Sequence, residues 1–195
     1  MKTLQLRRID KPYFGYEDIA RVLHISPQSA RVAASRYVRA GMLLRLKPNI
    51  YILKERWPYL TIEEKFSLAN LIQVPSYISL TTALSYYEIT TQMQQNFIEC
   101  IAVKRTKEVE IEDTLFKYTK IDTRFYFGFV KWRGFFIAEP EKALLDALYL
   151  MSHGKYKLDI TAVDFDKLDS AVLRQFADKF PERTQKLLKR FYDRS

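Results

Sequence analysis

The segment from residue 16 to residue 41 constrains the fold most, because it carries start and stop signals for two short helices in close succession. Residues 16–23 place acids in a first helical turn and apolar residues at helical spacing. Ser26-Pro27 then supplies an N-cap and a favoured first helical residue, and Gly41 can end a helix over residues 27–40. Two short helices separated by about three residues have helix-turn-helix spacing.

The predicted second helix divides into an apolar and a polar face. Ala30, Ala33, Ala34 and Tyr37 follow the spacing of a buried stripe. The other face offers hydrogen-bond donors and positive charge, as base edges and phosphates require. Recognition helices enter the major groove with their N-terminal end, so we expect base edges to be read from that end. The predicted base-reading residues are Gln28, Ser29 and Arg31.

Two short apolar runs, residues 42–46 and 50–53, follow this helix and flank Lys47-Pro48-Asn49. This pattern predicts a β-hairpin, and asparagine tolerates the left-handed conformation that such a turn needs. Helix, turn, helix and hairpin in this order are typical of a winged helix-turn-helix. The residues expected mainly to contact the DNA backbone are Ser35, Arg36, Arg39, Arg45, Lys47 and Asn49.

Positive charge is concentrated in the same part of the chain. The net charge is +9, and residues 1–60 hold 12 basic and 4 acidic side chains, whereas residues 61–195 hold 20 and 19. Residues 19–54 contain seven basic residues and no acid. A local excess of this kind, on a helix-turn-helix pattern, indicates duplex DNA as the partner and not a membrane.

Composition excludes several other classes of protein. A single cysteine, Cys100, cannot form an intrachain disulfide, and the first residues lack a signal-peptide pattern, so we expect a cytoplasmic protein. No stretch is long and apolar enough to span a membrane. The five glycines form no phosphate-binding loop, and the two histidines lie far apart. The sequence therefore predicts no cofactor, no metal and no enzymatic activity.

Residues 61–195 predict an α+β domain with an antiparallel sheet and C-terminal helices, so the domain boundary is expected at residue 60. Thr61 and Glu64 form a capping box that starts one helix, and another is expected over residues 80–87. Aromatic and β-branched residues predict strands at residues 97–103, 108–111, 115–121, 124–130 and 134–138. Further helices are expected at residues 139–151, 165–180 and 182–193.

Two alternatives from other functional classes stay open at this point. Glu139, Glu141 and Asp146 could serve a metal-dependent nuclease, although acids in a first helical turn and the i, i+4 pair of Lys142 with Asp146 have a simpler structural explanation. The aromatic-rich C-terminal region could instead hold a protein partner, with the winged helix serving only as a vestigial module.

Three stretches together resemble the AbiEi family of bacterial antitoxins, which belong to abortive-infection toxin–antitoxin systems. Residues 40–53 read AGMLLRLKPNIYIL, residues 77–89 read YISLTTALSYYEI, and residues 138–150 read AEPEKALLDALYL. This chain has Pro48-Asn49 where family wings commonly turn through Arg-Gly, and Tyr87-Glu88 where His-Gly is frequent.

The resemblance implies a winged-helix domain at residues 1–60 that binds and represses the promoter of its own operon. It also implies that residues 61–195 form an antitoxin domain that neutralises a nucleotidyltransferase-type toxin encoded next to it, with or without direct binding. Inverted repeats in the operator are expected to be bound either by a homodimer or by cooperating monomers.

Overall fold

The computed structural model describes residues 2–92 and 94–192, and the chain divides into two compact units. Unit 1 is Met1–Lys65 and unit 2 is Phe66–Ser195. The change of unit falls inside helix α4 (Ile62–Ile72), slightly beyond the expected boundary at residue 60.

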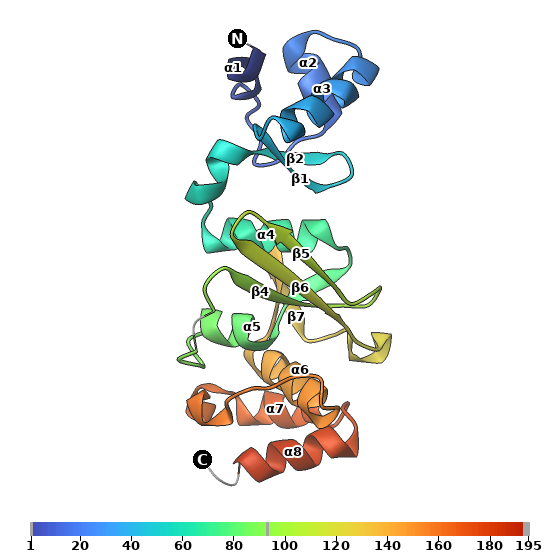
Figure 1. Cartoon of the computed structure of the whole chain (residues 1–195). Helices are drawn as coiled ribbons and strands as arrows, with labels where there is room; N and C mark the ends of the chain where they lie inside the picture. Colours follow the sequence, from blue (N-terminus) through green and yellow to red (C-terminus); the bar gives the residue numbers. More distant parts are fainter. Residues whose placement is uncertain (1, 93, 193–195) are drawn as a thin grey trace. The chain divides into compact units, whose positions relative to one another are not determined.

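Unit 1 contains three helices followed by a hairpin (Figure 1). Its elements are α1 (Lys2–Leu6), α2 (Tyr16–Leu23), α3 (Pro27–Arg39), β1 (Leu43–Lys47), β2 (Ile50–Leu53) and the 3-10 helix η1 (Lys54–Tyr59). The two helices and the hairpin predicted from the sequence are therefore confirmed. Phe14 and Tyr51 exchange backbone hydrogen bonds of 3.0 and 2.9 Å, which join the segment before α2 to β2. Ile19, Ala30 and Leu43 bring α2, α3 and β1 into one apolar core.

Unit 2 contains a six-stranded sheet and helices on both of its faces (Figure 1). Its strands are β3 (Ser76–Ile78), β4 (Phe97–Ala102), β5 (Lys107–Ile111), β6 (Thr114–Lys120), β7 (Phe129–Trp132) and β8 (Phe135–Ala138). Its later helices are α5 (Leu80–Tyr86), α6 (Pro140–Ser152), α7 (Ser170–Ala177) and α8 (Glu182–Tyr192). Short 3-10 helices lie at Thr123–Phe125, Ile160–Ala162 and Phe165–Lys167.

The prediction of an antiparallel sheet is wrong, because the sheet is mixed. The strand order is β5-β6-β4-β3-β8-β7, and the β3–β8 and β4–β6 pairs are parallel. The strand β3 lies near the middle of the sheet, yet it has only three residues and directly follows Pro75, so it gave no strand pattern. Parallel pairing depends on the path of the connections and not on the composition of each strand.

Helices cover both faces of the sheet, and its inner strands β3 and β4 are almost fully buried. On one face, the hydroxyl of Tyr118 donates a hydrogen bond of 2.7 Å to the carbonyl oxygen of Ala69 in α4, and Phe66 contacts Phe135 edge to face. On the other face, the hydroxyl of Tyr77 donates a hydrogen bond to the carboxylate of Asp146 in α6. Cys100 is fully buried in β4.

The segment predicted as a strand over residues 124–130 is irregular in its first half. Asp122 accepts a hydrogen bond from the backbone N–H of Arg124 at 3.1 Å and starts a 3-10 turn. Phe125 stacks on Phe180 with 5.0 Å between ring centroids, so these aromatic side chains pack against the C-terminal helices. The helix expected over 165–180 is likewise shorter, since Asp169 caps α7. Residue 193, the expected end of the last helix, lies outside the described residues.

Over residues 2–92 and 94–192, none of the helices combines the length and the apolar character needed to cross a bilayer.

Helices α3 and α5 end in the same hydrogen-bond pattern but with different residues at the left-handed position. At the end of α3, the backbone N–H of Gly41 (φ +67°) donates to the carbonyl oxygen of Val38, and the N–H of Met42 donates to that of Tyr37. At the end of α5, the N–H of Glu88 (φ +58°) donates to Ser85 in the same way, and the N–H of Ile89 donates to Leu84. Both sets of bonds form a Schellman motif. Glycine adopts this conformation without steric cost, whereas a residue with a Cβ is strained there.

Glu88→Gly should therefore stabilise unit 2 by about 0.5–1 kcal/mol, because the relieved strain exceeds the added flexibility of the unfolded chain. Urea unfolding followed by circular dichroism measures this change. The matched control is Gly41→Ala, which should destabilise unit 1 by a similar amount although a Cβ there meets no atom within 4 Å. A Glu88→Gly protein that unfolds at lower urea would contradict the expectation.

Candidate nucleic-acid interface

Helix α3 forms where the sequence places its start and its buried face. The hydroxyl of Ser26 accepts a hydrogen bond from the backbone N–H of Ser29 at 3.2 Å, and Pro27 occupies the first helical position. Ala30 and Ala34 are fully buried, and their small side chains let α3 pack closely on α2. The opposite face of α3 is exposed to solvent.

The three residues predicted to read base edges lie together on the exposed N-terminal half of α3. Gln28 makes no side-chain hydrogen bond within the described part of the chain. The hydroxyl of Ser29 lies 2.9 Å from that of Ser26, so it also supports the helix cap. Arg31 contacts the Tyr16 side chain of α2. Gln28, Ser29 and Arg31 thus lie on one exposed part of α3. The contact of Arg31 with Tyr16 is one that helical periodicity did not indicate.

The arginines predicted to contact phosphates are exposed and available. Across residues 2–92 and 94–192, the side chains of Arg36, Arg39 and Arg45 form neither a hydrogen bond nor an ion pair. Ser35 is exposed as well, but its hydroxyl donates to the carbonyl oxygen of Arg31 at 3.3 Å. Unpaired guanidinium groups on one surface attract phosphate strongly, because no neighbouring carboxylate competes for them.

A bulge in the hairpin determines which side chains point outward. The β1–β2 register shifts between Arg45 and Lys47, so the intervening Leu46 has no partner across the hairpin. Strict alternation would place Leu43 and Leu46 on opposite faces, but both are buried while Arg45 between them is exposed, as the local disruption by a bulge allows. Lys47 is half-buried at the end of β1.

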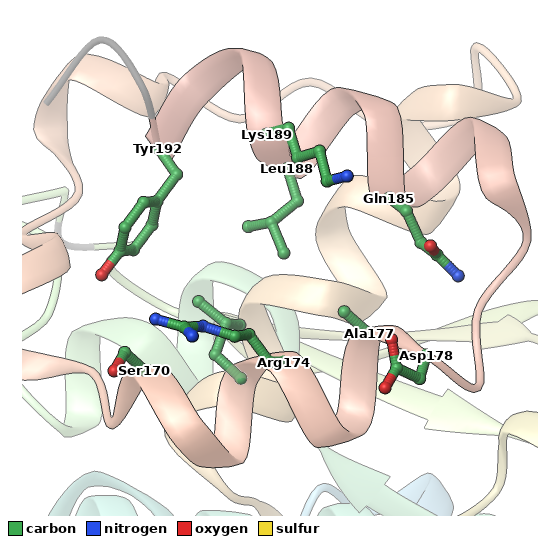
Figure 2. A pocket seen from close by; sticks show the side chains of 9 residues that line it. Ser170, Arg174, Ala177, Asp178, Gln185, Leu188, Lys189 and Tyr192 are labelled. Atoms are coloured by element: carbon green, nitrogen blue, oxygen red, sulfur yellow. The ribbon is translucent and has the colours of Figure 1, made fainter.

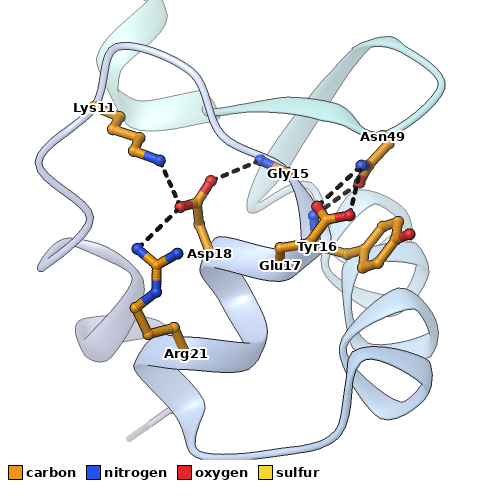
Figure 3. Close-up of polar contacts among 7 residues, drawn as sticks. All are labelled: Lys11, Gly15, Tyr16, Glu17, Asp18, Arg21 and Asn49. Atoms are coloured by element: carbon orange, nitrogen blue, oxygen red, sulfur yellow. Dashed lines mark hydrogen bonds and ion pairs between the residues drawn. The ribbon is translucent and has the colours of Figure 1, made fainter.

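Asn49, predicted to contact the DNA backbone, has its side chain engaged inside unit 1. It adopts the left-handed conformation expected of this turn (φ +60°). Its Oδ1 accepts a hydrogen bond from the backbone N–H of Tyr16 at 2.8 Å, and its Nδ2 donates to Glu17 at 3.0 Å (Figure 3). The hydrogen bond from Asn49 holds the pKa of the Glu17 carboxyl below its ordinary value. The turn is thus fastened to the first turn of α2, a long-range contact that no local pattern reveals.

The second acid of α2, Asp18, is also balanced locally (Figure 3). It accepts hydrogen bonds from Lys11 at 2.7 Å and from the backbone N–H of Gly15 at 3.1 Å, and Arg21 lies 3.6 Å away. Partial burial acts to raise the pKa of Asp18, but these hydrogen bonds and positive charges outweigh it, so the pKa is lowered. Both acids of α2 are therefore matched by other groups and leave the arginines of α3 and β1 uncompensated.

In unit 2, the segments 77–89 and 138–150 meet in a buried polar network. Asp146 of α6 accepts hydrogen bonds from the hydroxyls of Tyr77 at 2.9 Å and Ser79 at 2.8 Å, and it pairs with Lys142 one turn away. Lys142 also donates to the Tyr77 hydroxyl at 2.8 Å. The predicted i, i+4 pair is confirmed, and both side chains are fully buried.

The surroundings of this pair are aromatic. The Lys142 ammonium lies 5.2–5.3 Å from the ring centroids of Tyr77, Phe127 and Phe180. Burial lowers the pKa of Lys142 and raises the pKa of Asp146, and the attraction between the two charges opposes both shifts. Each charge depends on the other, because water reaches neither of them.

Two of the three carboxylates considered for a nuclease are engaged with structural partners. Asp146 belongs to the buried pair, and Glu141 is buried and accepts a hydrogen bond from the backbone N–H of Asp169 at 2.8 Å. Glu139 occupies the N-cap position of α6. Within the described part of the chain, no group of three His, Cys, Asp or Glu side chains is arranged to hold a metal ion.

A groove of about 370 Å³ lies between α7 and α8, which both pack on α6 (Figure 2). Leu173, Ala177 and Leu188 give it an apolar floor. Arg174 lines it from α7 and Lys189 from α8, and among the described residues neither side chain forms an ion pair. Asp178 also lines the groove, which therefore combines apolar surface with two cations and one acid.

Comparisons with known proteins find a family match for the N-terminal part of the chain. Residues 1–54 match the model of the AbiEi_4 family, described as "Transcriptional regulator, AbiEi antitoxin". The resemblance to AbiEi antitoxin regulators is therefore confirmed over these residues. The crystal structure of the RV2827C protein from Mycobacterium tuberculosis is similar, with a TM-score of 0.63 and 12% identity over 98% of this chain and 74% of that chain. At this identity the similarity shows a shared fold alone. No curated protein matches the sequence.

Lys142→Met should destabilise unit 2 by about 3–5 kcal/mol at pH 7, because the Asp146 carboxylate is left buried without a counterion. The double variant Lys142→Met/Asp146→Leu removes both charges and should cost clearly less. In the single variant the folded-state pKa of Asp146 lies above its unfolded value, so the loss of stability should shrink as the pH falls from 7 toward 4. Urea unfolding at several pH values measures both effects. A double variant with a lower free energy of unfolding than the single variant would contradict the expectation.

Proposed function

We propose that this chain, whose first 54 residues match a family of AbiEi antitoxin regulators, is a DNA-binding transcriptional repressor that controls its own operon. In this proposal residues 1–60 act as a winged helix-turn-helix, with α3 as the recognition helix and the β1–β2 hairpin as the wing. The observation that carries it is that Arg36, Arg39 and Arg45 are exposed and, within the described residues, unpaired on and beside the capped, well-packed helix α3. Such a surface suits the phosphate-lined grooves of duplex DNA.

The side chains divide by the contacts that they can make. Gln28 and Arg31 near the start of α3 would read base edges in the major groove. Arg36 and Arg39 further along the helix, with Arg45 and Lys47 of the hairpin, would bind the backbone and set the register of the protein on DNA. Ser29, Ser35 and Asn49 already make hydrogen bonds within unit 1, so we assign them a supporting role in the interface.

Unit 2 would carry the antitoxin activity against a nucleotidyltransferase-type toxin, and the chain would act without catalysis of its own. This part of the proposal rests on the family resemblance, supported by the meeting of two of its three sequence stretches in the Lys142–Asp146 network. We expect operator inverted repeats, bound by a homodimer or by cooperating monomers.

A second candidate function, protein binding by unit 2, is favoured by the groove between α7 and α8. Its apolar floor and the cations Arg174 and Lys189, which outnumber the single acid Asp178 in the lining, suit an acidic segment with apolar anchors from a partner protein. The chain would be co-expressed with the protein encoded next to it. A stoichiometric complex that is lost in Arg174→Glu/Lys189→Glu, together with no affinity for DNA, would favour this function; no complex would count against it.

The primary proposal predicts that Arg31→Ala/Arg36→Ala abolishes specific binding to DNA from the protein's own promoter region. One groove-reading arginine contributes about 1–3 kcal/mol of base discrimination, and one phosphate contact contributes about one unit of the salt slope. Fluorescence anisotropy at several salt concentrations measures both quantities. The melting temperature should stay unchanged, because both side chains are exposed.

The control is Lys104→Ala/Arg105→Ala, which removes the same charge from an exposed loop of unit 2. It should leave specific binding nearly intact, since it changes net charge without touching α3. Equal loss in both double variants would mean that net charge alone drives binding. Unchanged binding by the Arg31→Ala/Arg36→Ala protein would exclude α3 as the recognition helix.

A further inference from the structure

Tyr16, the first residue of α2, holds the side chain of Arg31 on α3. The guanidinium carbon of Arg31 lies 4.7 Å from the centroid of the Tyr16 ring, and Nη2 donates a hydrogen bond to the Tyr16 hydroxyl at 3.1 Å. Two contacts of different kinds therefore restrain one long side chain. Arg36 and Arg39 on the same helix have no comparable restraint among the described residues.

The backbone of Tyr16 is fixed in turn by the hairpin. Gly15 precedes it at the N-cap and has no side chain to satisfy the free N–H groups of the first helical turn. Asn49 supplies that acceptor from the β1–β2 turn, and its Nδ2 is held by Glu17 at 3.0 and 3.3 Å (Figure 3). A continuous chain of contacts thus runs from the hairpin turn through α2 to Arg31.

We propose that Tyr16 and Asn49 are positioning residues that set Arg31 for bidentate recognition of a guanine in the major groove. This inference rests on the proposed DNA-binding function. Arg31 gives one N–H to Tyr16 and keeps the others, which suffice for the O6 and N7 acceptors of guanine. A side chain held in place before binding loses less conformational entropy on contact, so restraint favours discrimination between bases. Arg36 and Arg39 lack this restraint and suit phosphates, which tolerate many geometries.

The test measures binding of the full chain to its operator duplex and to duplexes in which each G·C pair is replaced in turn by A·T. Wild type should lose about 5- to 150-fold at one guanine per half-site, and Arg31→Ala should lose that preference. Tyr16→Leu should reduce the preference to about threefold or less with an unchanged salt slope, because no phosphate contact is removed. Tyr16→Phe keeps the ring and should retain most of the discrimination.

Asn49→Gly provides a second route, since glycine keeps the left-handed turn and removes only the amide. It should weaken the guanine preference without touching Tyr16 or Arg31. The matched control Tyr13→Leu removes an aromatic ring of unit 1 that makes no contact with Arg31 among the described residues and should leave the preference intact.

A double-mutant cycle separates positioning from general destabilisation. Tyr16→Leu should have no further effect on base preference in the Arg31→Ala background, whereas two independent structural effects would add. Full guanine discrimination by both Tyr16→Leu and Asn49→Gly, or additive effects in the cycle, would overturn the inference and leave the proposed function standing. Absence of operator binding by the wild-type chain would overturn both.

Discussion

The ion pair between Lys142 and Asp146 is the interaction on which unit 2 depends. It joins α6 to the central strand β3 through Tyr77, and it is enclosed by aromatic rings from the segment after β6 and from the loop before α8. A buried pair of this kind gives little net stability compared with apolar side chains, but either charge alone would be costly. The pair therefore restricts the possible packings to those that bring these segments together.

In unit 1, by contrast, the charges of the candidate interface lie at the surface and are not buried in ion pairs. The acids of α2 are paired with Lys11, Arg21 and Asn49. Among the described residues, Arg36 and Arg39 of α3 and Arg45 of β1 stay exposed without a hydrogen-bond or ion-pair partner. Structural charge is thus neutralised within the unit, and the remaining charge faces solvent. This separation is what makes the excess of positive charge in residues 1–60 available to a ligand.

Local signals were sufficient for α2, α3 and the β1–β2 hairpin of unit 1, whereas α1 and η1 were not predicted. Ser26, Pro27 and Gly41 define α3 through capping chemistry, and the alanine spacing defines its buried face, so the candidate residues Gln28, Ser29 and Arg31 could be placed before the structure. The side chains that contact those residues could not be predicted from the sequence. Tyr16 reaches Arg31, and Asn49 reaches Tyr16, across separations that have no periodic pattern. In unit 2 the three-residue strand β3 and the parallel pairings escaped prediction for the same reason, because tertiary connections decide them.

The unpaired arginines also have a consequence for the stability of unit 1 in solution. Like charges on one surface repel each other, and this repulsion acts against the folded state when few counterions are present. At 0.1 M ionic strength, salt largely screens the repulsion between exposed charges that lie more than about 10 Å apart. The same ions compete with the protein for a polyanion. Salt should therefore strengthen the fold of unit 1 under the conditions in which it weakens the attraction of that surface for its ligand.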